Sequence, residues 1–282
     1  MISVLQLGTI DYATGLRLQE KLVGLRKEGR VGDTLLLLEH SPVITLGRNA
    51  KAANIVASPE LVAQRRVEVF DCDRGGDVTF HGPGQLVAYP IFDLRAFPAH
   101  DENRRTLGAV EFVRRLEEVL IRTCTVFGIP SKRIAGLTGV WTDAPESTGG
   151  NRRAGTGDLE PSVEPDPTGP EAKIAALGIH ISRGVTSHGI ALNVNTDLSF
   201  FNLIVPCGIT SKPVTSMQKE LGRTLPMLDV AHALSRNFGA LFQTQMLWLE
   251  SLDALLGKNL GVPMKVPEEI RKLHGDDEAT WA

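Results

Sequence analysis

The residues best suited to chemistry lie within residues 173–208, which hold one lysine, two histidines and a cysteine. Cys207 follows Pro206, which fixes its own φ, and precedes a glycine that lets other groups approach closely, so the turn could expose the thiol. An ordinary thiol is mostly protonated at neutral pH, so a nucleophilic role needs a neighbouring base. Lys173 or His188 could supply that base. The alternative is that Cys207 is a small buried hydrophobe.

A second unusual stretch, residues 74–85, reads RGGDVTFHGPGQ and holds four glycines and a proline. Two turns around a short strand would let backbone N–H groups, beside Arg74 and His81, bind a phosphate, a carboxylate or an acyl carbonyl. The spacing matches neither of the common nucleotide-binding loops, GxGxxG and GxxxxGK[ST]. The alternative is two tight hairpin turns with His81 as an ordinary hydrogen-bonded residue.

Composition excludes several function classes. The 282 residues carry a net charge of −3, with no basic excess to attract nucleic acid or an anionic membrane. The first residues lack a signal-peptide pattern and no run approaches the ~20 apolar residues of a membrane span, so we expect a cytoplasmic protein. Three distant cysteines, at 72, 124 and 207, form neither a disulfide framework nor a zinc knuckle. A zinc site drawn from His81, His180, His188 and Cys207 is disfavoured because no pair has ligand spacing.

The elements that must position these residues can be placed by hydrophobic periodicity. We expect a helix over residues 11–28 capped by Asp11, two strands within 34–46 bent at Pro42, and a strand over 77–80. A long helix over 103–127 should bury Leu107, Val110, Val113, Leu116, Leu120, Cys124 and Phe127 and leave Arg114, Arg115, Glu117 and Glu118 largely outside. Residues 173–183 and 185–195 should form a hairpin with Lys173 and Cys207 at opposite ends of one unit.

The remaining segments are less regular. A short strand is expected over 138–142, and residues 145–170, which lack large apolar side chains, should form a flexible insertion. Asp197 should cap one helical turn, Thr215 or Ser216 another, and the chain after Thr224 should be helical until a frayed tail over 275–282. We interpret Cys72 and Cys124 as structural.

Four motifs in this order and spacing resemble the lipoyl(octanoyl) transferases of lipoate biosynthesis: RGGDVTFHGPGQLVAYP, KIAALGIHI, HGIALNVN and PCGI. The resemblance runs from about residue 33 to 217 and implies the fold shared with lipoate and biotin protein ligases. That fold is α+β, a mixed central sheet flanked by helices, here in a single catalytic domain over 1–282. Two departures are a phenylalanine at 80, where the family often has tyrosine, and a long insertion over 144–172.

The resemblance also implies the reaction and its partners. An octanoyl group moves from the phosphopantetheine thioester of octanoyl-acyl carrier protein to a lysine of a lipoyl domain, by way of an acyl-enzyme thioester. The implied acceptors are the lipoyl domains of 2-oxoacid dehydrogenase complexes and the glycine cleavage H protein, and no cofactor, metal, nucleic acid or membrane is implied.

Carried over by position, the resemblance makes Cys207 the nucleophile and Lys173 its acid/base partner. The implied acyl-binding residues are Arg74, Gly75, Gly76, Asp77, Val78, Thr79, Phe80, His81, Ala176, Leu177, Gly178, Gly189, Ile190 and Ala191. Two rivals remain open: an ATP-dependent lipoate ligase of the same fold, which has no need of a nucleophilic cysteine, and a noncatalytic acyl-binding module.

Overall fold

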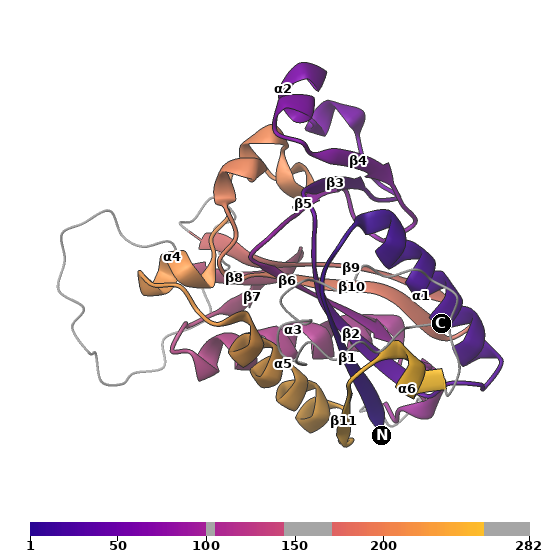
Figure 1. Ribbon diagram of the computed structural model, residues 1–282. Coiled ribbons are helices and arrows are strands. Elements are labelled where there is room, and N and C mark those ends of the chain that lie inside the picture. The colour runs from indigo at the N-terminus through magenta and orange to yellow at the C-terminus, as the bar shows by residue number, and fades with distance from the viewer. Residues whose placement is uncertain (100–104, 144–170, 257–282) are drawn as a thin grey trace, which may run out of the picture.

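The chain folds around an eight-stranded mixed sheet with the order β11-β1-β2-β6-β10-β9-β8-β7 (Figure 1). The computed structural model describes residues 1–99, 105–143 and 171–256. β1 pairs in parallel with β2 and β11, and the other neighbours are antiparallel. The strands are β1 (Ile2–Ile10), β2 (Asp33–His40), β6 (Gln85–Ile91), β7 (Lys132–Ile134), β8 (Leu137–Asp143), β9 (Glu171–Ser182), β10 (Val185–Asn193) and β11 (Met246–Leu249).

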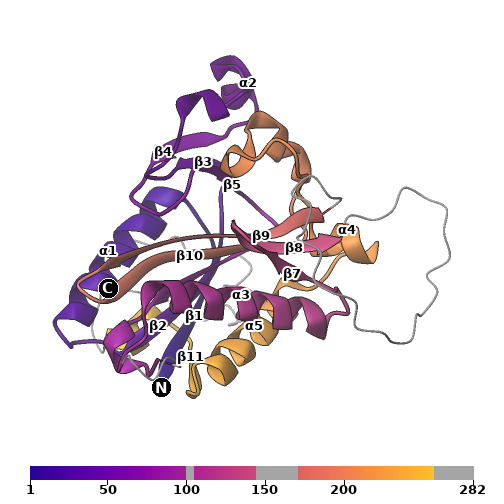
Figure 2. The same ribbon diagram turned by 180° about the vertical axis from the view of Figure 1, so that it is seen from behind.

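Helices cover both faces of this sheet, which confirms the expected α+β class (Figures 1 and 2). α3 (Ala109–Val126) and α5 (Met227–Leu241) pack on one face, where the largest core cluster lies. α1 (Tyr12–Lys27) packs on the other face against β6 and β10. Its N-cap is Asp11, as the sequence predicts, with the Thr14 amide donating to Asp11 Oδ1 at 2.7 Å. The central strands are buried on both faces, so β2 and β6 are almost continuously apolar.

A second, three-stranded sheet with the order β4-β3-β5 lies over the α1 face of the main sheet (Figure 1). Its strands are β3 (Val43–Leu46), β4 (Glu68–Asp71) and β5 (Val78–His81), and the short helix α2 (Pro59–Gln64) is attached to it. The break between β2 and β3 falls at Ser41 and Pro42, where the sequence predicts a bend. β5 is thereby held facing β6, β10 and β9, and the space between them forms the cavity described below.

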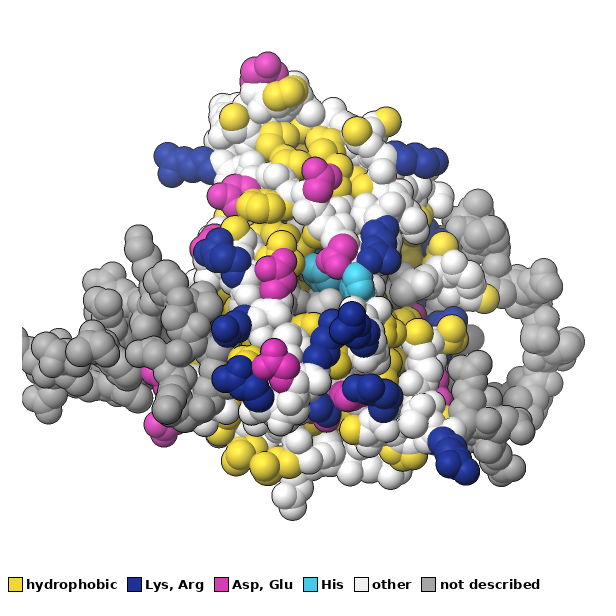
Figure 3. Space-filling model, turned by 90° about the vertical axis from the view of Figure 1, so that its right-hand side faces the viewer, with side chains coloured by type: hydrophobic (Ala, Val, Ile, Leu, Met, Phe, Trp, Pro, Cys, Tyr) yellow, Lys and Arg dark blue, Asp and Glu magenta, His cyan; other side chains and the backbone are white. Residues whose placement is uncertain are grey.

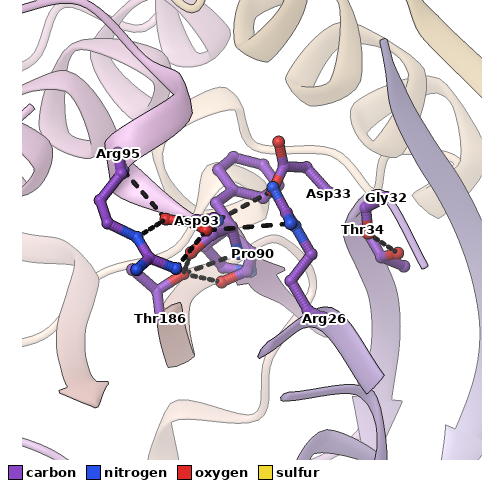
Figure 4. Close-up of polar contacts among 9 residues, drawn as sticks. Arg26, Gly32, Asp33, Thr34, Pro90, Asp93, Arg95 and Thr186 are labelled. Carbon is purple, nitrogen blue, oxygen red and sulfur yellow. Dashed lines mark hydrogen bonds and ion pairs between the residues drawn. The ribbon is translucent and has the colours of Figure 1, made fainter. Parts of the chain in front are cut away.

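Polar contacts fasten the sheet near the turn of the β9–β10 hairpin (Figure 4). The Arg26 side chain, near the end of α1, contacts the Asp33 carboxylate at 2.8 Å and that of Asp93 at 3.8 Å. Asp93 also accepts from Arg95, and the Thr186 hydroxyl on β10 donates to the Pro90 carbonyl on β6. The β9–β10 hairpin is thus anchored at its turn, and Lys173 lies near its opposite end.

Two expectations about helices are wrong. Val110 is 75% exposed, and Arg115 and Glu117 are buried, because α3 begins after Gly108 and turns Phe112, Leu116 and Leu120 toward the core. Both charged residues are tolerated inside because each has an ion-pair partner. The chain after Thr224 is also not wholly helical.

After α5 the chain forms β11, a four-residue strand that pairs with β1 and is followed by α6 (Leu252–Leu256). β1 and β7 are further strands that the sequence analysis does not predict. The start of the long helix before residue 105, the insertion over 145–170 and the tail over 275–282 lie outside the described residues. Across the described parts, no helix combines the length and apolar character needed to cross a membrane.

Candidate active site

The Lys173 amine and the Cys207 thiol meet at one end of the cavity, with Nζ 3.3 Å from Sγ. Lys173 lies near the start of β9 and is only 7% exposed. Cys207 lies in the short 3₁₀ helix Pro206–Gly208 and is half-buried. The two residues for which the sequence analysis predicts the roles of nucleophile and base are therefore in contact.

A β-bulge directs Lys173 into the cavity. Val140 on β8 is opposite Ala175, whereas the next residue, Trp141, is opposite Lys173, so Ile174 is an extra residue on β9. Ile174 and Ala175 both point into the core on the α3 side. Since side chains of a regular strand alternate between faces, the bulge is what returns Lys173 to the cavity face that Ala176 also lines.

Cys207 has a left-handed backbone, with φ 57° and ψ 20°, which is unfavourable for a residue with a Cβ by roughly 1–2 kcal/mol. Neighbouring contacts hold this conformation. The Val205 amide donates to the Asn54 carbonyl at 2.7 Å, and Asn54 Nδ2 donates to Asp77 Oδ2 at 2.6 Å. A Cβ at Gly208 would lie 2.9 Å from the same Asp77 oxygen. The turn Pro206–Gly208, called here the nucleophile turn after the role expected of Cys207, is therefore fastened to the glycine-rich loop.

The cavity has a volume of about 360 Å³ and lies between β5 and the β6–β10–β9 part of the main sheet. Most of the acyl-binding residues implied by the resemblance line it: Arg74, Gly76, Asp77, Thr79, His81, Ala176, Leu177, Gly178, Gly189, Ile190 and Ala191. Gly75, Val78 and Phe80 do not. Val78 and Phe80 alternate with Thr79 and His81 along β5, so they point the other way into a small apolar cluster.

Arg74 serves as a buried brace inside the glycine-rich loop. Its guanidinium donates to the carbonyls of Thr45, Gly75 and Asp77, at 2.6, 3.1 and 2.6 Å, and to the Thr45 hydroxyl. The contacts join β3 to the loop before β5, so the arginine shapes the cavity wall. Carbonyl dipoles compensate its charge, and within the described ranges no carboxylate pairs with it.

A chain of amide groups fixes the proton on His81. Backbone carbonyls only accept, so Asn193 must donate to Thr215 O and Gln85 must donate to Phe80 O. Gln85 Nε2 then also donates to Asn193 Oδ1, and Gln85 Oε1 accepts from His81 Nδ1–H at 2.7 Å. His81 Nε2 is left as an acceptor beside the cavity. Burial, then the neighbouring His40, lowers the pKa of His81 to about 3, so it is neutral at physiological pH.

Two aromatic rings close the cavity near α1: Tyr12, which lies outside the four motifs, and Tyr89, which lies within the first of them. Tyr12 and Tyr89 line it, and the Tyr12 ring stacks on His81 with centroids 6.3 Å apart. Tyr89 donates to His40 Nε2 at 2.6 Å while His40 Nδ1–H donates to Ile10 O. Burial lowers the pKa of His40 to about 4 and raises the pKa of Tyr89, so this wall is uncharged. No sequence signal marks Tyr12 as a cavity residue, because the fold alone brings it to the site, whereas Tyr89 lies in a motif but is not among the implied acyl-binding residues.

His188 is not placed to act on Cys207. It pairs with Ile179, six residues beyond Lys173 along β9, a separation of roughly 20 Å at the usual strand rise. Its Nε2 contacts Asp73 Oδ1 at 2.7 Å, and His180 contacts the other Asp73 oxygen at 2.6 Å. Burial lowers the pKa of His188 despite that carboxylate. One face of the molecule shows histidine side chains between acidic and basic ones (Figure 3).

The two other cysteines, Cys72 and Cys124, are also free thiols. Cys124 is fully buried in the core, and burial raises its pKa to about 12, which makes it a poor nucleophile. The Cys72 thiol donates to the Leu46 carbonyl at 3.4 Å. In the described ranges, no three histidine, cysteine, aspartate or glutamate side chains gather as a metal ion requires.

Comparison with known proteins shows the family of this chain. The family model for the lipoyl protein ligase A/B catalytic domain matches residues 11–239. The octanoyltransferase of Koribacter versatilis is 57% identical over 277 residues, 98% of each chain. That of Acidobacterium capsulatum is 54% identical over 258 residues, 91% of this chain and 96% of the relative.

Solved structures show the same fold at low sequence identity. A bipartite lipoate protein ligase from Thermoplasma acidophilum is 16% identical with a TM-score of 0.61, over 89% of this chain and 87% of that one. Lipoate-protein ligase A bound with ATP is 15% identical with a TM-score of 0.59, over 89% of each chain. These two likenesses support the fold alone, whereas the curated relatives and the domain model together identify the enzyme class. The chain is an acyltransferase and belongs to the octanoyltransferase family.

Proposed function

We propose that this enzyme transfers an octanoyl group from octanoyl-acyl carrier protein to a lysine of a lipoyl domain through a thioester on Cys207. The observation that carries the proposal is the 3.3 Å contact between Lys173 Nζ and Cys207 Sγ at the end of a largely apolar cavity. The acceptors would be lipoyl domains of 2-oxoacid dehydrogenase complexes and the glycine cleavage H protein. Because the reaction needs a reduced thiol, we propose the cytoplasm as its location.

In the first half-reaction Lys173 acts as base and then as acid. Its neutral amine takes the proton from the Cys207 thiol, and the thiolate attacks the carbonyl carbon of the octanoyl thioester. The bond from that carbon to the pantetheine sulfur then breaks. The pantetheine thiolate leaves with the electron pair and takes the proton from the Lys173 ammonium. The products are free carrier protein and octanoyl-Cys207.

The second half-reaction uses the same two side chains, with Lys173 again acting first as base and then as acid. The neutral amine of the acceptor lysine attacks the octanoyl-Cys207 carbonyl, and Lys173 accepts a proton from the attacking nitrogen. The C–N bond forms as the C–S bond breaks. The Cys207 thiolate then regains a proton from Lys173, so the enzyme returns to its starting state with the acceptor carrying an amide.

The cavity suits a saturated acyl chain. Ala176 faces Ala191 and Gly178 faces Gly189 across the hairpin, and all four line the cavity, so its floor on β9 and β10 is built from small residues. The uncharged wall of Tyr12 and Tyr89 lies alongside. Each methylene that leaves water for such a surface contributes roughly 0.8 kcal/mol, so an octanoyl tail can supply much of the binding free energy.

The proposal is tested by intact-protein mass after mixing the enzyme with octanoyl-acyl carrier protein without ATP. We expect one octanoyl group on the wild-type chain, removal of that group by hydroxylamine, and no adduct on Cys207→Ser. A parallel reaction with free octanoate and ATP tests the ligase alternative. Transfer to a lipoyl domain only in that second reaction, without an enzyme adduct, would replace the proposal with ligase chemistry.

The noncatalytic alternative is tested in the same experiment. A binding module would bind the octanoyl carrier protein, but the masses of both proteins would stay unchanged. Appearance of free carrier protein in step with octanoyl-enzyme would therefore exclude simple binding.

A further inference from the structure

Glu117 on α3 is a buried carboxylate on the side of the sheet away from the cavity, and its side chain is 0% exposed. Arg114 contacts Glu117 Oε2 at 2.7 Å and Arg133 on β7 contacts the same oxygen at 3.1 Å. The other oxygen, Oε1, accepts a hydrogen bond from the backbone amide of Gly139 at 3.2 Å. One carboxylate thus joins a helix, an edge strand and β8.

Gly139 lies directly against the Lys173 side chain. A Cβ added at Gly139 would lie 2.6 Å from Lys173 Cε, 3.4 Å from Lys173 Nζ and 2.9 Å from the Ala175 carbonyl oxygen. Trp141, two residues later, places its ring 5.0 Å from Lys173 Nζ. The β8 backbone at Gly139 and the Trp141 ring therefore border the lysine side chain, and a displacement of either would change where Nζ points.

The Glu117 bond reaches β8 at the bulge. The register shift falls between Val140 and Trp141, immediately after Gly139, and bulges locally disrupt the backbone ladder. A buried carboxylate is costly to keep inside a protein unless its oxygens are satisfied. Among the described residues, Oε2 is paired with Arg114 and Arg133, whereas Oε1 accepts from the backbone amide of Gly139.

We propose that Glu117 is a positioning residue for Lys173, which acts by holding the Gly139 amide and thereby the bulge that directs the lysine to Cys207. The inference rests on the proposed function, because its readout is octanoylation of Cys207. The hydrogen bond to Gly139, rather than the ion pairs to Arg114 and Arg133, determines the rate of Cys207 octanoylation.

Two conservative variants disturb the bond to Gly139, and the Arg114 variant described below disturbs an ion pair instead. Glu117→Asp keeps the negative charge for the arginines but is one methylene shorter, so its oxygen withdraws from Gly139. Glu117→Gln keeps the length but has one oxygen for donors on two sides, the arginines and the Gly139 N–H. The single-turnover burst of octanoyl-enzyme gives two numbers for each: the amplitude measures the fraction of folded, competent enzyme, and the rate constant measures the geometry of the lysine and thiol.

We expect Glu117→Asp to slow the burst at least tenfold at an amplitude near that of the wild type, since small displacements near reacting groups can cost roughly 10²-fold. Glu117→Gln should also slow the burst, because its one oxygen is drawn to the two guanidinium groups and its NH2 group then faces the Gly139 N–H. The KM for octanoyl-acyl carrier protein should be unchanged in both. Rates expressed per burst amplitude remain meaningful even when part of a variant preparation is unfolded.

Arg114→Met is the matched control, because the Arg114 side chain is 52% exposed and its loss removes one ion pair while leaving the Gly139 bond. Its burst rate constant should equal that of the wild type. The inference is overturned if Glu117→Asp reacts at the wild-type rate, or if Arg114→Met is as slow as Glu117→Asp. Absence of any adduct on the wild-type enzyme would instead contradict the proposed function.

Discussion

Lys173 and Cys207 are 34 positions apart in the chain, yet Lys173 Nζ lies 3.3 Å from Cys207 Sγ. The β9–β10 hairpin carries the chain away from Lys173 and back, and the residues that follow return Cys207 to the start of β9. The Thr215 amide donates to the Lys173 carbonyl and the Lys173 amide donates to Pro213 O, so the segment after Cys207 is bonded to the lysine backbone itself. The backbone around Lys173 on β9 therefore helps to position both side chains.

Replacing Lys173 with methionine should slow octanoyl-enzyme formation by roughly 10²–10⁴-fold, the usual contribution of general acid/base catalysis. Methionine has a similar volume, so the packing against Trp141 should survive while the proton acceptor is lost. The burst rate in single-turnover mixing measures the effect.

His188→Asn is the companion variant, because asparagine tolerates the positive φ of 56° at this position. Its burst rate should remain near that of the wild type, since His188 lies on β10 opposite Ile179, six residues along β9 from Lys173. A slow His188→Asn together with a normal Lys173→Met would assign the base to the histidine and contradict the lysine role.

Cys207→Ala should abolish octanoyl-enzyme formation and leave the melting temperature close to that of the wild type. The residue is half-buried in a turn and lies outside the core, so its truncation removes little packing. Cys124→Ala should show the opposite behaviour, full activity with a loss of stability of order 1 kcal/mol, because Cys124 is completely buried. Appreciable transfer by Cys207→Ala would indicate direct attack by the acceptor amine on the carrier thioester.

The parts of the fold that follow local rules could be predicted from the sequence. Asp11 and Ser216 cap helices through their own side chains, and the β9–β10 hairpin has its turn at Arg183 and Gly184. β11 could not be predicted by periodicity, because four half-exposed residues carry little pattern and the strand exists through pairing with β1. Tertiary pairing also explains the burial of Glu117, which periodicity alone would leave at the surface.

In the candidate site, too, some features could be predicted from the sequence and others could not. Lys173 and Cys207 could be chosen by residue type and turn context, and their contact follows from the hairpin. The bulge at Ile174 could not be predicted, because only the pairing with β8 shows that an extra residue is present. Tyr12 and Gly139 lie in unremarkable local sequence, and their roles arise from close approach in three dimensions.

Two glycines with nearly the same backbone should respond differently to alanine. Gly208 has φ 68° and Gly222 has φ 67°, so each Gly→Ala change carries a similar backbone penalty of about 1 kcal/mol. At Gly222 the new Cβ meets nothing within 4 Å, whereas at Gly208 it would press on Asp77 Oδ2. We expect similar losses of stability in denaturant unfolding but slower Cys207 octanoylation only in Gly208→Ala. Equal burst rates would show that the nucleophile turn absorbs the added methyl group.

The buried histidines should make the protein less stable in mild acid. Burial lowers the pKa of His40 to about 4 and of His81 to about 3, from an ordinary value of 6.5. In the unfolded chain both would bind a proton near pH 6.5, while in the folded protein they stay neutral, so the unfolded state takes up more protons as the pH falls. The stabilising effect of the neutral histidines is complete above about pH 6.5 and is lost progressively as the pH falls toward their folded pKa values.

At pH 5 the loss should be about 2 kcal/mol for each histidine as an order of magnitude, since one pKa unit corresponds to 1.36 kcal/mol. The measurement is the free energy of unfolding in urea at pH 7, 6 and 5, a window above the range in which carboxylates such as Asp73 titrate. His40→Gln should be less stable overall, because the partners of the ring at Ile10 and Tyr89 lose their geometry, but its stability should depend less steeply on pH. An unchanged slope in His40→Gln would mean that protonation of this histidine is not what weakens the fold, whatever the absolute stability of the variant.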